Sequence, residues 1–370
     1  MKAVWITGVG VVSPLGNSVR ELTERFHAGE TAIVPLSEPA GRFGASVGDI
    51  PLELVPSSAR TRLGRLDRFC RLLLSAAFSA VDAAQLRISP DAAHRVGLSV
   101  GTGLGCLLTN AEYNQKLVEH GAAAASPRLF AYTVSSAAAG EVSIALGIKG
   151  PNVTAHQGFA AGLGAVGYGF DLIRMGKADV VLAGGVDALG PALTLGLEDM
   201  GLLKTTPAAV PFQDEVPGLY PSEGAAVLVL EDSEYARQRG AQPLAVIRGY
   251  ACGFEPTLTR RERQATALRE TMDRALARSD VPAGAIDLVF SSAHATALDT
   301  LEQAAITAVL GRPRVFAPKQ AWGECFAAHG VLSAALAVGT MRSANSPRLA
   351  LIHALCYSGP TVALVIARED

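Results

Sequence analysis

The chain has 370 residues, of which 49% are apolar, and its formal net charge is −2. A chain of this length can bury a large core, and the near-zero charge excludes the basic excess typical of nucleic-acid-binding proteins. Its five cysteines stand singly without metal-ligand spacing, as suits a reducing cytoplasm, and no apolar run is long enough to span a membrane.

Residues 2–16 predict a strand followed by glycine-rich turns. A dinucleotide-binding fingerprint would require a helix directly after the strand, and Pro14 and Gly16 stand where that helix would be. This disfavours a nucleotide, and we expect no cofactor. The segment also lacks the charged start and cleavage site of a targeting signal, so we expect a cytoplasmic protein.

Residues 60–84 predict a helix that begins in a basic patch. The patch contains five arginines at short intervals: Arg60, Arg62, Arg65, Arg68 and Arg71. They can form a solvated helix face, or they can dock an acidic partner. Further on, residues 96–107 predict a strand and a glycine turn, and residues 110–121 and 135–146 predict helices.

Residues 150–176 predict a strand, a sharp turn at Gln157-Gly158 and a helix that starts near Phe159. The helix contains four glycines, each of which costs about 1 kcal/mol relative to alanine unless close packing recovers it. We therefore expect this helix to be buried at the centre of the molecule, and the sequon at Asn152 to lie in a buried strand. Such a junction suits a nucleophile, because helix-terminal N–H groups stabilise developing negative charge. Phe159 cannot act as one.

The second half of the chain repeats the pattern of the first. The later segments match earlier ones in order: 244–249 matches the N-terminal strand, 286–291 matches 96–100, 348–353 matches 179–183, and 361–368 matches 225–231. Each half alternates strands with helices, which is typical of mixed sheets covered by helices.

These motifs resemble the β-ketoacyl synthase family, the condensing enzymes of the thiolase fold. The resemblance covers essentially the whole chain, including the start of the chain, the stretch Gly150-Pro151-Asn152, the run 179–187 and the region 211–231. It implies an α/β thiolase fold in which two duplicated βαβαβαββ halves, 1–235 and 236–370, pack as one compact unit of five α-β-α-β-α layers.

The resemblance also implies that the catalytic set is degenerate. Phe159 occupies the position of the family's catalytic Cys, and Glu324 replaces the second of two active-site histidines. His294, in Ser292-Ala293-His294-Ala295-Thr296, and Lys319 are retained. Two free cysteines, Cys325 and Cys356, remain as replacement nucleophiles, and neither falls at the strand–helix junction in the sequence.

Ser333 stands where the family has the Glu that partners the lysine. We therefore hypothesise that Glu324 has become the counter-ion of Lys319, a pairing that favours both charged forms.

Other roles follow from the resemblance alone. It implies carrier-protein docking through Arg62, Arg65 and Arg68. It also implies an acyl tunnel and gate formed by Leu104, Phe130, Thr133, Val134, Phe159 and Tyr357. Each wall residue can equally be an ordinary core residue.

Loss of the Cys and one His with retention of the scaffold resembles chain-length factors. These inactive subunits pair with an active ketosynthase as a heterodimer and shape the tunnel in fatty acid, polyketide or polyene biosynthesis, including aryl polyenes. The expected partners are that ketosynthase and acyl carrier protein. Two alternatives stay open: a malonyl-carrier-protein decarboxylase or acyltransferase using His294, and a homodimeric acyl-binding scaffold.

Overall fold

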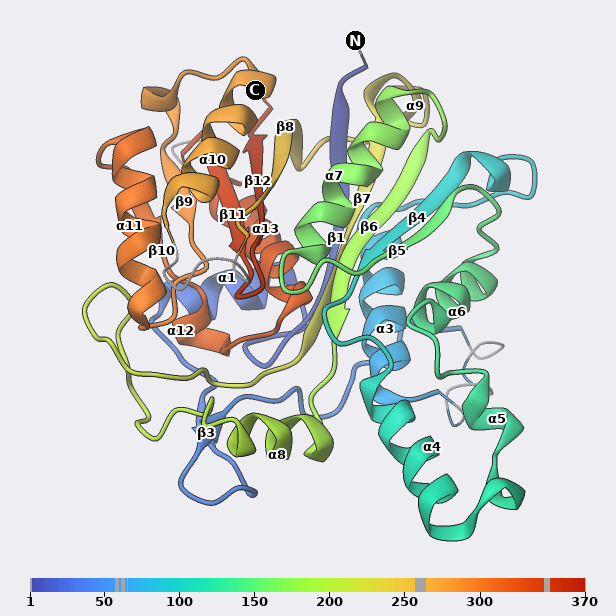
Figure 1. Ribbon diagram of the computed structural model, residues 1–370. Helices are drawn as coiled ribbons and strands as arrows, with labels where there is room; N and C mark the ends of the chain where they lie inside the picture. Colours follow the sequence, from blue (N-terminus) through green and yellow to red (C-terminus); the bar gives the residue numbers. More distant parts are fainter. Residues whose placement is uncertain are drawn as a thin grey trace.

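A computed structural model describes residues 2–56, 60, 64, 66–256, 264–342 and 347–369. Within these ranges two similar groups of five strands form one continuous ten-stranded sheet (Figure 1). The N-terminal group runs in the order β5 (Asn152–Ala155), β4 (Val96–Gly101), β6 (Val180–Asp187), β7 (Gly224–Asp232) and β1 (Val4–Val12). The C-terminal group runs in the order β10 (Arg314–Phe316), β9 (Leu288–Phe290), β11 (Leu349–Leu355), β12 (Pro360–Ala367) and β8 (Ala245–Phe254).

The two groups share one pairing scheme, which confirms the repeat seen in the sequence. In each group the second strand pairs in parallel with the first and the third. The fourth strand is antiparallel to both the third and the fifth. The groups join where β1 pairs with β8 at Val4, Trp5 and Ile6.

Helices form three layers around the two sheet halves, which gives the five-layered thiolase arrangement (Figure 1). Two central helices lie between the halves, and further helices cover the outer faces. The central pair is α7 (Ala161–Arg174) and α13 (Ala327–Thr340); α3 (Arg68–Ala83) and α6 (Ala137–Leu146) cover one outer face, and α10 (Thr266–Ser279) and α11 (Ala297–Leu310) cover the other.

Shorter elements complete the described fold. They are α1 (Val19–His27), α4 (Leu107–His120), α5 (Pro127–Phe130), α8 (Pro191–Asp199), α9 (Ser233–Gln238), α12 (Lys319–Trp322), the strands β2 (Val34–Pro35) and β3 (Phe43–Gly44), and the 3-10 turns Ala93–Arg95, Ala122–Ala124 and Ala283–Ala285. No helix in the described ranges is long and apolar enough to cross a membrane.

The glycine-rich helix is buried at the centre, as its sequence indicates. A Cβ atom on Gly162 would overlap with the carbonyl oxygen of Ala327 at the start of α13, and one on Gly167 would overlap with the ring of Tyr250. The glycines thus permit a close approach of α7 to its neighbours, which recovers their cost in helix propensity.

Two expectations about element limits and burial are wrong. The helix expected over 60–84 is interrupted: Arg60 is helical, residues 64, 66 and 67 are not, and 61–63 and 65 lie outside the described residues. The main helix, α3, begins at Arg68, where the Asp67 side chain caps it by accepting a hydrogen bond from the Cys70 amide at 2.9 Å. The strand containing Asn152 is not buried: β5 lies at the end of the sheet order, and Asn152 is exposed. Because β5 is the last strand of the sheet, one of its edges has no strand beside it. The β-branched residues of its sequence predict a strand but do not show whether that strand is central or at the edge.

Candidate functional site

The strand–turn–helix junction lies at the carboxyl end of β5. Gly158 adopts the left-handed conformation (φ 58°) that makes the sharp turn, and α7 begins at Ala161, two residues after Phe159. The Phe159 amide donates a hydrogen bond to the Sγ of Cys356 at 3.3 Å. Cys356 therefore does lie at the junction in space, which corrects the expectation from its sequence position.

The Phe159 ring is half-buried and belongs to an aromatic cluster. It packs edge-to-face on Phe326, with ring centroids 5.0 Å apart, and on Tyr357, with centroids 5.9 Å apart. Leu104 packs against the same apolar cluster. Phe326 itself is buried and has a positive φ of 51°, which is strained for a bulky residue. The residue that follows the turn at Gly158 is thus fixed by packing against two other aromatic rings.

The predicted pairing of Lys319 with Glu324 is confirmed. Lys319 Nζ lies 2.6 Å from Glu324 Oε2, and both side chains are about 98–99% buried. The other carboxylate oxygen, Oε1, accepts the Phe326 amide at 2.8 Å. The pair holds α12 against the start of α13, and Ser333, although buried, provides no second carboxylate there.

His294 is held in a turn by side chains from α11. The carboxylate of Asp299 accepts hydrogen bonds from the backbone amides of His294 at 3.1 Å and Ala295 at 2.8 Å, and Glu302 accepts that of Ser292 at 2.7 Å. Ala295 adopts a left-handed conformation (φ 62°), so the turn keeps a glycine-like backbone without glycine.

The hydrogen bonds of His294 define its tautomer. Nδ1 lies 3.2 Å from the Ser292 carbonyl oxygen, which can only accept, so Nδ1 carries the proton. Burial, and then the nearby Lys319 cation, lower the pKa of His294 well below its usual value, so the ring is neutral near pH 7. Nε2 therefore accepts a hydrogen bond that the Tyr357 hydroxyl donates. It has no proton to donate to a substrate oxygen.

A pocket of about 510 Å³ opens beside this cluster. Phe159 and Tyr357 line it from the side of the junction, and Leu197, Leu202 and Leu219 are among its other lining residues. Among the residues that the structure describes, no group of three His, Cys, Asp or Glu side chains is placed to hold a metal ion.

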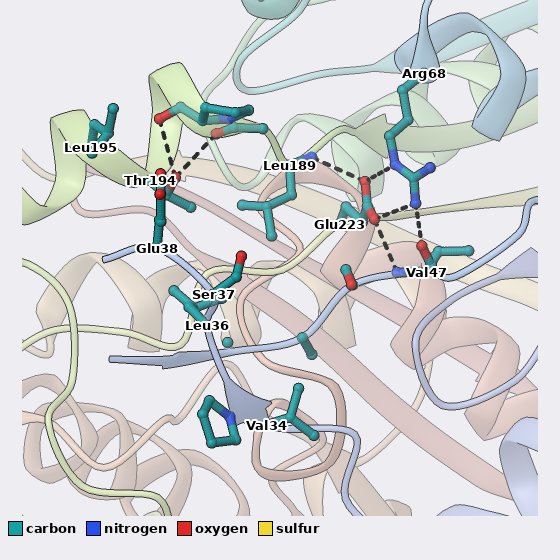
Figure 2. A pocket seen from close by; sticks show the side chains of 16 residues that line it. Val34, Leu36, Ser37, Glu38, Val47, Arg68, Leu189, Thr194, Leu195 and Glu223 are labelled. Atoms are coloured by element: carbon teal, nitrogen blue, oxygen red, sulfur yellow. Dashed lines mark hydrogen bonds and ion pairs between the residues drawn. The ribbon is translucent and has the colours of Figure 1, made fainter. Parts of the chain in front are cut away.

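Arg68 takes part in an internal ion pair. Its guanidinium binds both carboxylate oxygens of the buried Glu223, at 2.7 and 2.6 Å, and also the Val47 carbonyl oxygen. Glu223 in turn accepts the amides of Val47 and Leu189, and this network forms one wall of a second pocket of about 520 Å³ (Figure 2). Arg62 and Arg65 lie outside the described residues.

Comparison with known proteins identifies the family. The family described as "Beta-ketoacyl synthase, N-terminal domain" matches residues 1–236, and "Beta-ketoacyl synthase, C-terminal domain" matches residues 244–352. The chain belongs to the β-ketoacyl synthase family.

Curated β-ketoacyl synthases match over part of their length. The 3-oxoacyl-(acyl-carrier-protein) synthase 2 of Synechocystis sp. (strain ATCC 27184 / PCC 6803 / Kazusa) is 31% identical over 261 residues, 68% of this chain and 62% of that protein. The protein of the same name from Staphylococcus aureus (strain COL) is 33% identical over 259 residues, 67% of this chain and 62% of that protein. The chain thus matches about three-fifths of the length of these relatives.

Solved structures match over the whole chain. A structure described as "The ishigamide ketosynthase/chain length factor" has a TM-score of 0.89 at 25% identity, with both chains covered completely. A β-ketoacyl synthase from Burkholderia phymatum STM815 has a TM-score of 0.88 at 24% identity, again over both full chains, and shows the shared fold.

The structure brings together only some of the residues proposed from the β-ketoacyl synthase motifs. Leu104, Phe159 and Tyr357 lie in or beside the aromatic cluster, and His294 contacts Tyr357. The remaining wall candidates do not line the pocket beside Phe159: Phe130 is 63% exposed, Val134 is 53% exposed and Thr133 is half-buried.

The sequence did not point to two residues of this candidate site. Phe326 packs directly on Phe159. In the sequence, only its position two residues after Glu324 could have indicated that it lies near the site. Lys204 is completely buried and donates to the carbonyl oxygens of Val216 at 2.5 Å and Ala295 at 2.9 Å. A single lysine in a loop gave no sign of that burial.

Proposed function

We propose that this chain is a catalytically inactive, chain-length-factor-like subunit. It pairs with an active β-ketoacyl-(acyl-carrier-protein) synthase and shapes the acyl tunnel in fatty acid, polyketide or polyene biosynthesis. The observation that carries the proposal is Phe159, which stands at the nucleophile position and offers no group that can accept an acyl chain. The similarity to a ketosynthase/chain length factor structure supports it.

The hydrogen bonds around Phe159 add to this argument. Condensation needs donors aimed at a thioester oxygen and at the enolate that forms on loss of carbon dioxide. Here the Phe159 amide donates to Cys356, Nε2 of His294 accepts from Tyr357, and the carboxylate of Glu324 takes the place of a second histidine. The same bonds weigh against the alternative in which His294 acts alone as a decarboxylase or acyltransferase residue.

The surface near β5 suits a partner subunit. β5 ends the sheet order, and an uncovered strand edge can pair with a strand of another chain. The helix α6 contacts β5, and large apolar side chains are exposed on α6 and shortly before it, with Ile144 62% and Val134 53% exposed. Since exposed apolar patches mark interaction sites, we propose that the active ketosynthase binds here.

Co-expression with an active ketosynthase tests the pairing. We expect a one-to-one complex to co-purify, and we expect Val134→Arg to weaken it. Val34→Arg is a matched control, because Val34 is the same residue type and is also 53% exposed, on β2. A chain that purifies alone as a homodimer and never binds a ketosynthase would instead favour the homodimeric scaffold.

Acyl carrier protein is the second proposed partner, docking on the basic segment before α3. Because Arg68 is engaged with Glu223, the docking charges in this proposal are chiefly Arg62 and Arg65. In the complex, the double change Arg62→Glu and Arg65→Glu should weaken carrier-protein binding most strongly at low salt, where surface charges attract over the longest range.

A further inference from the structure

Lys204 is a completely buried cation that forms no ion pair with a carboxylate among the described residues. Its ammonium group donates instead to two backbone carbonyl oxygens, that of Val216 at 2.5 Å and that of Ala295 at 2.9 Å. It also lies 5.6 Å from the centre of the Tyr220 ring. Burying a cation without a counter-ion is costly, so these bonds must serve a purpose other than filling space.

The bonds of Lys204 join two segments of the chain. One is the capping segment, residues 204–219, which is closed on itself by a bond from the Lys204 amide to the Leu219 carbonyl oxygen at 3.1 Å. The other is the turn that carries His294. The Val216 amide donates at 2.9 Å to the same Ala295 carbonyl oxygen that accepts from the Lys204 ammonium. Lys204, Val216 and Ala295 thus form a closed triangle of hydrogen bonds.

Ala295 is held from both sides in a backbone conformation that alanine rarely adopts. Its φ is 62°, in the left-handed region, and such a conformation persists only where the surroundings determine it. On one side the Ala295 amide donates to the Asp299 carboxylate at 2.8 Å. On the other side its carbonyl oxygen accepts from Lys204 and Val216. Lys204 supplies the charged donor of this clamp.

The conformation of Ala295 determines where the preceding residue, His294, places its ring. Nδ1 of His294 lies 3.2 Å from the Ser292 carbonyl oxygen of the same turn, and Nε2 accepts from Tyr357. The ring makes both contacts only while the turn keeps its shape. Lys204 also acts on the ring through space: burial is the main cause that lowers the pKa of His294, and the Lys319 and Lys204 cations lower it further.

We propose that Lys204 is a positioning residue for His294. By clamping the Ala295 carbonyl oxygen to the capping segment, it keeps the turn in its left-handed form and the imidazole in one tautomer against Tyr357. This role belongs to the isolated chain and does not rest on pairing with a ketosynthase. The two proposals can therefore fail independently.

The ¹⁵N resonances of the His294 ring test the proposal. In Lys204→Met we expect the Nδ1 and Nε2 shifts to move towards each other, because a ring released from Ser292 and Tyr357 exchanges its proton between the two nitrogens. Adding Ala295→Gly should restore most of the wild-type separation, since glycine adopts a positive φ without a clamp. An unchanged separation in Lys204→Met would overturn the proposal, and so would a double variant that shows no recovery.

Arg239→Met is the matched control for general destabilisation. Arg239 follows α9 and binds the buried Glu231 carboxylate at 2.7 and 2.5 Å, so its loss also removes a cation from a buried network. The His294 resonances should keep their wild-type separation in this variant. A collapse equal to that of Lys204→Met would show that the ring responds to any loss of stability, and would overturn the specific role of Lys204.

Hydrogen exchange on the wild-type chain tests the same clamp without a substitution, in case Lys204→Met does not fold. The Val216 amide should exchange at least about a hundredfold more slowly than that of the neighbouring Glu215, and at a rate close to that of Ala295, because the two protected amides open together. A Val216 amide that exchanges as fast as that of Glu215 would show that the capping segment is not held to the turn.

Discussion

Lys319 Nζ and Glu324 Oε2 lie 2.6 Å apart, and both side chains are almost completely removed from solvent. Breaking a buried ion pair leaves an uncompensated charge, which typically costs 3–5 kcal/mol, whereas replacing both partners by apolar groups is often neutral. We predict a loss of about 3–5 kcal/mol in the free energy of unfolding for Lys319→Met or Glu324→Leu alone. The double variant should lose much less, as denaturant unfolding would show. Additive losses would mean that the two charges do not stabilise each other.

A thiol at position 159 should not be sufficient for condensation. In Phe159→Cys, the Glu324 carboxylate still pairs with Lys319 and His294 still accepts from Tyr357, so neither side chain can donate to an enolate or a thioester oxygen. We expect no 3-oxoacyl product in an assay with acyl- and malonyl-carrier protein. The variant should also be less stable, by about 1–3 kcal/mol, because an aromatic ring is lost from the cluster. Turnover above that of the wild-type chain would contradict the proposal of an inactive subunit.

Arg68 should affect stability more than carrier-protein docking. Its two bonds to the buried Glu223 carboxylate predict that Arg68→Ala lowers the free energy of unfolding by about 3 kcal/mol or more. Arg71→Ala is a control on the same helix, because its Nε donates to the Leu66 carbonyl oxygen instead of a buried carboxylate. Equal, small losses for both variants would show that the Arg68–Glu223 pair is not important for the fold.

The stability of the chain should depend on the protonation of Lys204. Burial lowers the pKa of Lys204 from 10.5 to about 8, so between these values the unfolded chain binds more protons than the folded one. The free energy of unfolding of wild type relative to Lys204→Met should therefore rise between about pH 8 and pH 10.5, by about 1–3 kcal/mol. Urea unfolding of both proteins across this range measures the difference. Parallel pH profiles would exclude a lowered pKa.

His294 should stay neutral and keep one tautomer through the physiological range. Burial and Lys319 lower its pKa, and the Ser292 carbonyl requires the proton on Nδ1. Long-range ¹H–¹⁵N spectra should show no titration of His294 between about pH 6 and pH 8. In Tyr357→Phe the Nε2 resonance should move, because Nε2 loses its donor, while Nδ1 stays protonated. A proton on Nε2 in wild type would contradict this assignment.

The repeat and the central helix could be predicted from the sequence because each has a local cause, whereas the layer arrangement followed from the family resemblance. Alternating strand and helix patterns recur in both halves, and four glycines in one helix require close neighbours. The pairing of Lys319 with Glu324 was predictable from the family resemblance, which places the usual partner of the lysine at Ser333 and leaves Glu324 as the replacement.

Contacts between distant segments could not be predicted in this way. Cys356 lies 197 positions from Phe159, and only the folded chain shows that its sulfur accepts the Phe159 amide. The burial of Lys204 and the exposure of Phe130 likewise depend on how the loops pack over the sheet. Propensity and periodicity carry no information about such packing.

The pairing of β1 with β8 has a consequence for any attempt to divide this protein. The backbone groups of Val4, Trp5 and Ile6 face strand neighbours on both sides, one from each half of the chain. A fragment that ended between the halves would open this seam in the middle of the sheet and bare the apolar sides of α7 and α13 that now face each other. Such a fragment would aggregate through its open strand edge and its exposed apolar surface. Each of the two repeats therefore needs the other in order to fold.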